Sequence, residues 1–191
     1  MVYNIPNILT LLRIGLIPIL VVTFYLPFTW SHAVTAAVFA LAGITDWLDG
    51  YLARQLGQMS AFGAFLDPVA DKLMVAVALV MIVGEHPGMW LAIPAAVIIG
   101  REIAISALRE WMAEVGSRAK VAVSHIGKVK TTAQIIALLL LLYGQSVGAF
   151  PTMLVGMVLL YVAALLTLWS GFSYIRAAWP LLKAQGPAEG G

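Results

Sequence analysis

The sequence contains no cysteine and very few charged residues. Of its 191 residues, 10% are Asp, Glu, Lys or Arg, whereas 62% are hydrophobic and the mean hydropathy is +0.96. Without cysteine the chain forms no disulfide and no thiolate metal site. A soluble domain carries about 25% charged residues, so this composition excludes an ordinary soluble domain, and the apolar content excludes intrinsic disorder. The composition is that of an integral membrane protein.

Six apolar segments divide the sequence, separated by turn-forming residues or polar stretches. Because a helix needs about 20 apolar residues to cross the hydrocarbon core, each segment is a candidate transmembrane helix. The segments run roughly over Ile8–Leu26, His32–Leu52, Phe62–Val83, Met89–Leu108, Thr131–Tyr143 (extended slightly at each end) and Pro151–Tyr174. We expect an all-α integral membrane protein with six transmembrane helices in one domain, residues 1–183, followed by a flexible tail, residues 184–191.

Positive charge is confined to one end of these segments. The connections at the other end, residues 27–31, 84–88 and 144–150, contain only Glu85 and His86 as titratable residues. All eleven basic residues belong to the opposite end: Arg13, Arg54, Lys72, Arg101, Arg109, Arg118, Lys120, Lys128, Lys130, Arg176 and Lys183. Lys and Arg favour the cytoplasmic side of a membrane, so we expect both termini in the cytoplasm.

The four aspartates of the chain, Asp46, Asp49, Asp67 and Asp71, all lie at the cytoplasmic end of the second segment and the start of the third. Spacings of three and four residues place each pair on one helix face, so two neighbouring helices can direct four carboxylates into one space. Four aspartates at the bilayer centre would cost about 10–14 kcal/mol, so the arrangement requires the water interface and neutralising cations.

Oxygen ligands in this number suit hard divalent cations such as Mg²⁺ or Mn²⁺. Four carboxylates suffice for two ions about 3.5–4 Å apart, an arrangement that clamps phosphoryl oxygens during an in-line displacement. The alternative explanation is that the aspartates form ion pairs at helix ends with Arg54 and Lys72. That explanation suits a single aspartate better than four at these spacings.

The same residues spell a known signature. From Asp46 to Asp71 the sequence reads DWLDGYLARQLGQMSAFGAFLDPVAD, which fits D-x2-D-G-x2-A-R-x8-G-x3-D-x3-D at every fixed position. This resembles the signature of the CDP-alcohol phosphotransferase family. The resemblance implies a six-helix membrane enzyme, generally a homodimer, that transfers a phosphatidyl or related group from a CDP-linked donor to an alcohol and releases CMP.

The resemblance also implies roles for individual residues. Two divalent cations, Mg²⁺ or Mn²⁺, would be held by Asp46, Asp49, Asp67 and Asp71, and Asp71 would also be the general base. Contacts to the nucleotide would come from the signature and from a polar row on the first helix: Asn7, Thr10, Arg13, Gly50, Ala53, Arg54 and Gly63. For Asn7, a helix-capping role explains the residue equally well.

Three further segments, Asn4–Ile14, Gly100–Glu114 and His125–Gln134, resemble the bacterial branch of the family that uses sn-glycerol 3-phosphate as the acceptor. The implied substrates are CDP-diacylglycerol and glycerol 3-phosphate, at the cytoplasmic face of a bacterial inner membrane. An acceptor that carries a phosphate needs a cationic pocket beside the metals. We expect this pocket to be formed by Arg101, Arg109, Lys128 and Lys130, whereas anchoring to anionic lipid better explains Arg118 and Lys120.

The sequence alone leaves several alternative functions open. Serine and inositol phosphate are alternative acceptors within the family, although serine carries no phosphate for the basic cluster. A divalent-cation transporter also places acidic residues in its helices, but here all four aspartates lie at one face. An Asp-rich prenyltransferase would need pairs with a different spacing and a second Asp-rich site. Membrane lipids are expected partners, and nucleic acid is not.

Overall fold

Six α-helices make up the computed structural model, which describes residues 5–56, 61–114 and 125–184. Within these ranges the side chains of some helical residues fall outside the description. The helices are α1 (Ile5–Phe24), α2 (Ser31–Leu56), α3 (Ala61–Glu85), α4 (Met89–Glu114), α5 (His125–Tyr143) and α6 (Thr152–Ala184). The described residues contain no β-strand, so the predicted all-α architecture is confirmed.

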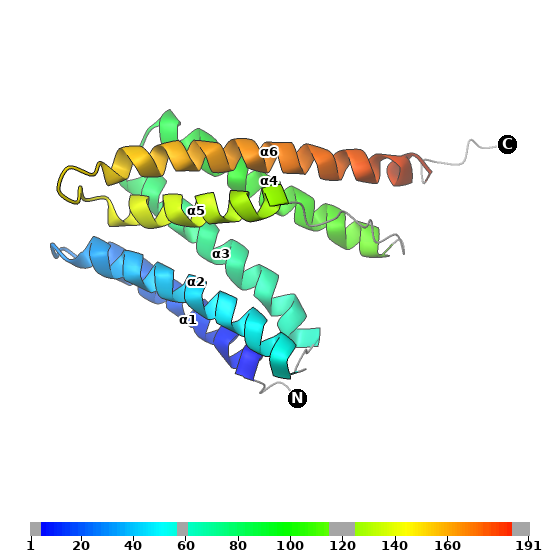
Figure 1. Cartoon of the computed structure of the whole chain (residues 1–191), viewed down its shortest axis with the longest axis horizontal. Coiled ribbons are helices and arrows are strands. Elements are labelled where there is room, and N and C mark those ends of the chain that lie inside the picture. Colours follow the sequence, from blue (N-terminus) through cyan, green and yellow to red (C-terminus); the bar gives the residue numbers. More distant parts are fainter. Residues whose placement is uncertain (1–4, 57–60, 115–124, 185–191) are drawn as a thin grey trace.

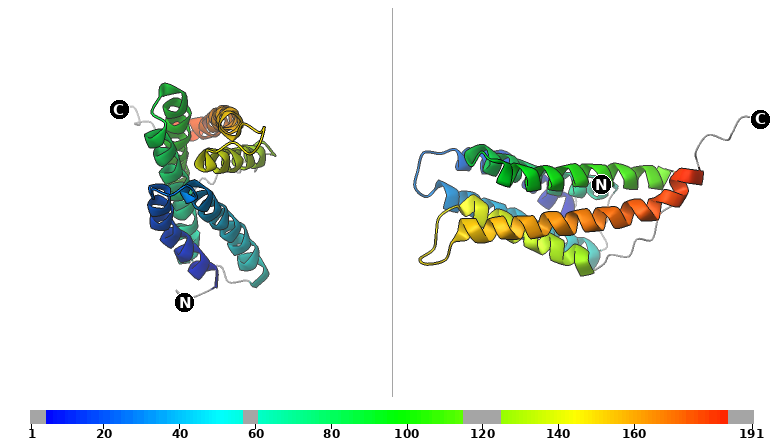
Figure 2. Two further views of the ribbon diagram at one scale, coloured as in Figure 1. Left: turned by 90° about the vertical axis from the view of Figure 1, so that its left-hand side faces the viewer. Right: turned by 90° about the horizontal axis from the view of Figure 1, so that it is seen from above.

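The helices form two antiparallel pairs linked by α3 and α4. Helix α1 packs along α2 and helix α5 along α6, while α3 contacts α1 and α4 contacts α6. Figure 1 shows α3 crossing between the two pairs, and the end-on view in Figure 2 separates the pairs clearly. The α1–α2 and α5–α6 connections lie at one end of the molecule, and the start of α1 and the end of α6 point to the other (Figure 1).

Each predicted apolar segment coincides with one helix, but the helices differ in how well they suit a bilayer. Among the described residues, three helices (α1, α4 and α6) are long and apolar enough to cross a membrane, and α2 and α5 contain shorter apolar stretches. Helix α3 is not among these three candidates, and Asp67, Asp71 and Lys72 interrupt its apolar sequence. The residues that distinguish α3 are therefore the signature aspartates and the lysine that follows them.

The interior and the surface are both apolar. Leu20, Leu79, Ile98, Leu138 and Leu160 are fully buried and belong to one core cluster that joins the helices. Large apolar side chains are also widely exposed, for example Val22, Val80, Leu165, Trp169 and Phe172. A soluble monomer rarely exposes so many large apolar side chains, whereas lipid tails cover them without cost. The surface therefore agrees with a membrane protein.

One glycine permits the close contact between α5 and α6. A Cβ atom on Gly156 would lie 2.9 Å from Cγ of Leu141, which is itself buried. Small residues allow membrane helices to approach closely, so this glycine sets the distance between the two helices. We expect Gly156→Val to destabilise the protein by about 2 kcal/mol through overpacking, measured by thermal unfolding in detergent.

Gly15→Val is the matched control, because no described atom outside the adjoining residues and backbone of its own helix lies within 4 Å of the Cβ position at Gly15. Both substitutions introduce the same β-branched residue into a helix, so the propensity effect is common to the two variants. Equal melting temperatures for the two variants would contradict the role assigned to Gly156.

Candidate functional site

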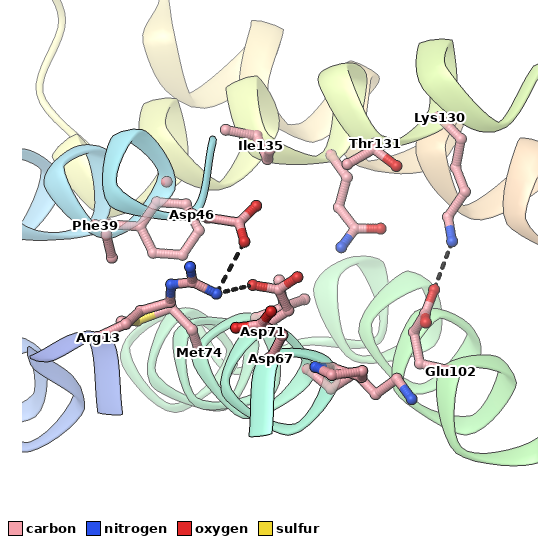
Figure 3. Close-up of a pocket in the computed structure, with 16 residues that line it drawn as sticks. Arg13, Phe39, Asp46, Asp67, Asp71, Met74, Glu102, Lys130, Thr131 and Ile135 are labelled. Atoms are coloured by element: carbon pink, nitrogen blue, oxygen red, sulfur yellow. Dashed lines mark hydrogen bonds and ion pairs between the residues drawn. The ribbon is translucent and has the colours of Figure 1, made fainter. Parts of the chain in front are cut away.

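Three of the predicted carboxylates converge on one pocket. Asp46 from α2 and Asp67 and Asp71 from α3 line an open cavity of about 370 Å³, with walls supplied by helices α1 to α5 (Figure 3). The side chains of Asp46 and Asp71 are 47% and 50% exposed, so both carboxylates face the open space. The expected convergence of carboxylates from two neighbouring helices is therefore seen for these three residues.

A buried arginine joins two of these carboxylates. Arg13 on α1 is only 1% exposed, and its Nη1 lies 2.9 Å from Oδ1 of Asp46 and 2.7 Å from Oδ1 of Asp71 (Figure 3). Taking a guanidinium out of water is unfavourable unless nearby anions compensate it. The arrangement shows that the two carboxylates point at a common position and that a cation is accommodated there.

The polar row predicted on the first helix faces this cluster. Asn7, Thr10 and Arg13 are each 1% exposed, although α1 is otherwise strongly apolar. Thr10 Oγ1 donates a hydrogen bond of 2.5 Å to Oδ1 of Asp67. Spacings of three residues keep successive members on nearly the same face of the helix, so α1 presents its polar row to the carboxylates of α2 and α3.

The remaining predicted residues are described less fully by the structure. Gly63 is buried near the start of α3. The side chains of Asp49, Gly50, Ala53, Arg54 and Lys128 lie outside the described residues, although all five positions belong to helices α2 or α5. The proposed roles of these five residues therefore remain predictions.

The opposite side of the pocket is basic. Lys130 on α5 is 7% exposed, and its Nζ lies 2.5 Å from Oε1 of Glu102 on α4 (Figure 3). Lys72, which follows Asp71 on α3, donates a hydrogen bond to Oγ of Ser106 and also lines the pocket. Arg101 Nη1 lies 3.1 Å from the same Glu102 oxygen. Three cations therefore surround one carboxylate, and the local charge is +2.

Two of the predicted phosphate-binding arginines are held against α6. Arg101 Nη2 donates a hydrogen bond of 2.8 Å to Oγ of Ser170. Arg109 Nη2 donates one of 2.5 Å to the hydroxyl of Tyr174, and its guanidinium carbon lies 4.6 Å from the centre of that ring. Of the four predicted basic residues, Lys130 lines the pocket, Arg101 reaches it through Glu102, and Arg109 packs on Tyr174.

Three polar residues that line the pocket, Lys72, Thr131 and Gln134, have no binding role predicted from the sequence. The sequence indicates Lys72 only as a positive charge at the cytoplasmic end and as the alternative ion-pair partner of the aspartates, and it indicates Gln134 only as part of a resembling segment. Sequence spacing contains a partial signal for Gln134, because a residue four positions after Lys130 shares its helix face. Nothing in the sequence reports that Lys72 turns towards Ser106, 34 residues away.

The donor set fits hard cations, but the described geometry forms no complete metal site. Among the residues described, no group of three or more His, Cys, Asp or Glu side chains is close enough to hold a metal ion. Asp46, Asp67 and Asp71 nevertheless bring carboxylate oxygens to the pocket, the type of ligand preferred by Mg²⁺ and Mn²⁺. Two of them already converge on the cationic group of Arg13.

Comparisons with known proteins agree with the signature. The sequence matches the CDP-alcohol phosphatidyltransferase family over residues 3–169. A Pseudomonas fluorescens protein named CDP-diacylglycerol–glycerol-3-phosphate 3-phosphatidyltransferase is 57% identical over 187 residues, covering 97% of this chain and 95% of the relative. Proteins with the same name from Salmonella choleraesuis and Pectobacterium atrosepticum are 56% and 55% identical, each covering 93% of this chain and 96% of the relative.

Proposed function

The chain belongs to the CDP-alcohol phosphatidyltransferase family, and we propose that it transfers the phosphatidyl group of CDP-diacylglycerol to sn-glycerol 3-phosphate, giving phosphatidylglycerophosphate and CMP. It is a membrane enzyme of phospholipid biosynthesis. Relatives that are 55–57% identical over nearly the whole chain are named for this reaction, which supports these substrates.

The observation that carries the proposal is the division of one pocket into an acidic and a basic side. Figure 3 shows Asp46, Asp67 and Asp71 on one side and Lys130 with Glu102 on the other. Lys72 turns towards this second side, because it donates a hydrogen bond to Ser106, whose hydroxyl donates to the backbone oxygen of Glu102. A phosphate-bearing acceptor needs positive charge to hold its phosphate while its hydroxyl points to the reacting centre. Because the local charge around Glu102 is +2, it balances a phosphate monoester dianion.

The four signature aspartates, Asp46, Asp49, Asp67 and Asp71, would hold two divalent cations, Mg²⁺ or Mn²⁺. When bound, these ions supply positive charge that holds the donor diphosphate and withdraws electrons from its β-phosphorus. The resemblance to the family supports their presence, as does the all-oxygen donor set. Arg13 keeps the carboxylates of Asp46 and Asp71 directed towards one position.

Asp71 is the proposed general base. The primary hydroxyl of glycerol 3-phosphate attacks the β-phosphorus of the donor, its proton passes to the Asp71 carboxylate, and CMP leaves. A carboxylate is a weak base at neutral pH, so part of its contribution is the positioning of the hydroxyl. The nucleotide would be held by the polar row of α1 and by signature residues: Asn7, Thr10, Arg13, Gly50, Ala53, Arg54 and Gly63.

The proposed topology places this chemistry at the cytoplasmic face of the bacterial inner membrane. All six helices would span the bilayer, with both termini in the cytoplasm, because all Lys and Arg residues belong to that end. Both substrates would then approach from where they occur: the acceptor from the cytoplasm and the donor from the membrane. The family resemblance supports a homodimer.

An acceptor panel tests the proposed function. The purified protein in detergent receives CDP-diacylglycerol and Mg²⁺ together with glycerol 3-phosphate, serine or inositol phosphate, and CMP release is measured. We expect release with glycerol 3-phosphate alone. Turnover with serine or inositol phosphate instead would support the proposed type of reaction but contradict the proposed acceptor. Folded protein that releases no CMP with any of them would contradict the proposal and favour cation transport.

Lys130→Met is expected to raise the KM for glycerol 3-phosphate by about 30-fold, because a charge-assisted contact to the acceptor phosphate is lost. The KM for CDP-diacylglycerol should stay within about twofold of the wild-type value, since the lysine lies on the basic side of the pocket. Steady-state CMP release with each substrate varied in turn measures both constants. An equal rise in the two KM values would contradict an acceptor-specific role for Lys130.

A further inference from the structure

Gln134 is a buried polar residue that has no role in the reaction proposed above. It lies on α5 one helical turn beyond Lys130, is 7% exposed and lines the same pocket. Its Oε1 atom is buried and accepts no hydrogen bond from any described residue. Buried polar atoms are nearly always hydrogen-bonded, so an unsatisfied amide oxygen at the wall of a substrate pocket calls for a partner that is absent from the free protein.

The chemistry of the atom restricts this partner. An amide oxygen only accepts hydrogen bonds, so it cannot interact favourably with the oxygens of a phosphate or a carboxylate. Neighbouring Lys130 is already engaged with Glu102. A neutral hydroxyl is the donor that suits a buried amide oxygen without requiring a further buried charge.

The position of Gln134 matches one particular hydroxyl. Figure 3 shows Lys130 on one side of the pocket, with α5 running from it past Thr131 towards Ile135, on the side where Asp46 lies. Gln134 immediately precedes Ile135, so it lies along α5 between Lys130 and the carboxylate side. In glycerol 3-phosphate the secondary hydroxyl on carbon 2 likewise lies between the phosphate and the primary hydroxyl that reacts.

We propose that Gln134 is a specificity-determining residue that accepts a hydrogen bond from the 2-hydroxyl of glycerol 3-phosphate. The proposal rests on the function proposed above, because it assumes that the phosphate lies on the basic side and the primary hydroxyl beside Asp71. This hydrogen bond would be the physical cause of the enzyme's preference for glycerol 3-phosphate as the acceptor. A substrate without that hydroxyl leaves Oε1 buried and unsatisfied, and the enzyme therefore discriminates against it.

The test compares glycerol 3-phosphate with 3-hydroxypropyl phosphate, which keeps the phosphate and the primary hydroxyl but lacks the 2-hydroxyl. For the wild-type enzyme we expect kcat/KM to favour glycerol 3-phosphate by about 30-fold. Gln134→Met retains side-chain length without the amide, so this preference should fall to about threefold or less. The KM for CDP-diacylglycerol should not change in this variant. A general distortion of the pocket would change that KM as well.

Gln145→Met is the matched control, because Gln145 lies in the α5–α6 connection and its Nε2 donates to the backbone oxygen of Thr29. This variant should keep the full wild-type preference. If Gln134→Met does not fold, as judged by size-exclusion chromatography, Gln134→Asn serves instead: its shorter side chain withdraws the oxygen, and the preference should again fall.

The outcomes separate this inference from the proposed function. No turnover of glycerol 3-phosphate by folded wild-type enzyme overturns both. Turnover by the wild type without preference for glycerol 3-phosphate, or a preference that survives in the folded Gln134 variants, overturns the role of Gln134 and leaves the proposed function intact. A preference lost only in the Gln134 variants supports the assignment.

Discussion

Asp71→Asn is expected to lower kcat for CMP release by about 10³-fold, the largest effect that we predict for a single substitution. Asparagine has the same shape but no negative charge and no basic oxygen. It therefore removes the proposed proton acceptor and one of the anionic ligands in a pocket where Asp71 Oδ1 lies 2.7 Å from Arg13 Nη1. The loss should appear in kcat with the protein still folded, because the Asp71 side chain is half exposed.

The matched control is Glu110→Gln, which makes the same carboxylate-to-amide change at an exposed position on α4. It should retain wild-type kcat within about twofold. Steady-state CMP release at saturating glycerol 3-phosphate, with folding checked by size-exclusion chromatography, measures both variants. If Asp71→Asn kept more than about a tenth of the wild-type kcat, Asp71 would not be the base.

Arg13→Met is expected to lower both activity and stability. The guanidinium is fully buried and pairs with Asp46 and Asp71 at 2.9 and 2.7 Å, so its removal leaves two carboxylates without their compensating charge. Breaking such a contact costs about 2 kcal/mol here, less than for a fully buried pair because the carboxylates are half exposed. We also expect kcat to fall by about 10²-fold, because the carboxylates lose their common orientation.

Two further variants separate the charge of Arg13 from its shape. Arg13→Lys keeps the charge but loses the planar group, so it should recover part of the stability and little of the activity. Arg176→Met removes an exposed arginine near the end of α6 and should leave both unchanged. Thermal unfolding and CMP release are measured on the same preparations. Wild-type unfolding and activity in Arg13→Met would show that the contact is dispensable.

The sequence was sufficient to predict the helices because each one has a long apolar stretch bounded by turn-forming or polar residues. The ends were less predictable. We expect α6 to end at Tyr174 from hydropathy, but it continues to Ala184, because the charged residue Arg176 interrupts an apolar segment without stopping a helix. Likewise α5 begins at His125, six residues before the apolar run. Hydropathy marks where a helix suits a bilayer, whereas the helix itself ends where its hydrogen bonding ends.

The convergence of Asp46, Asp67 and Asp71 on one pocket was predictable, because the four-residue spacing of Asp67 and Asp71 places both on one face of α3. Asp46 lies towards the end of α2, the helix that precedes α3 in the chain. Contacts between residues far apart in the sequence could not be predicted. The pairing of Arg13 with Asp71 joins residues 58 positions apart, and it depends on how α1 packs against α3. The orientation of Gln134 towards the pocket similarly depends on how α5 packs against α2 and α3.

Product stoichiometry tests most directly whether this one pocket transfers a phosphatidyl group to glycerol 3-phosphate. Purified enzyme in detergent receives CDP-diacylglycerol, Mg²⁺ and radiolabelled glycerol 3-phosphate, and CMP and chloroform-soluble label are measured together. We predict equal amounts of CMP and labelled phosphatidylglycerophosphate in the wild type, and formation of both products about 10³-fold slower in Asp71→Asn. Release of CMP without labelled lipid, or undiminished lipid formation by the variant, would contradict this role of the pocket.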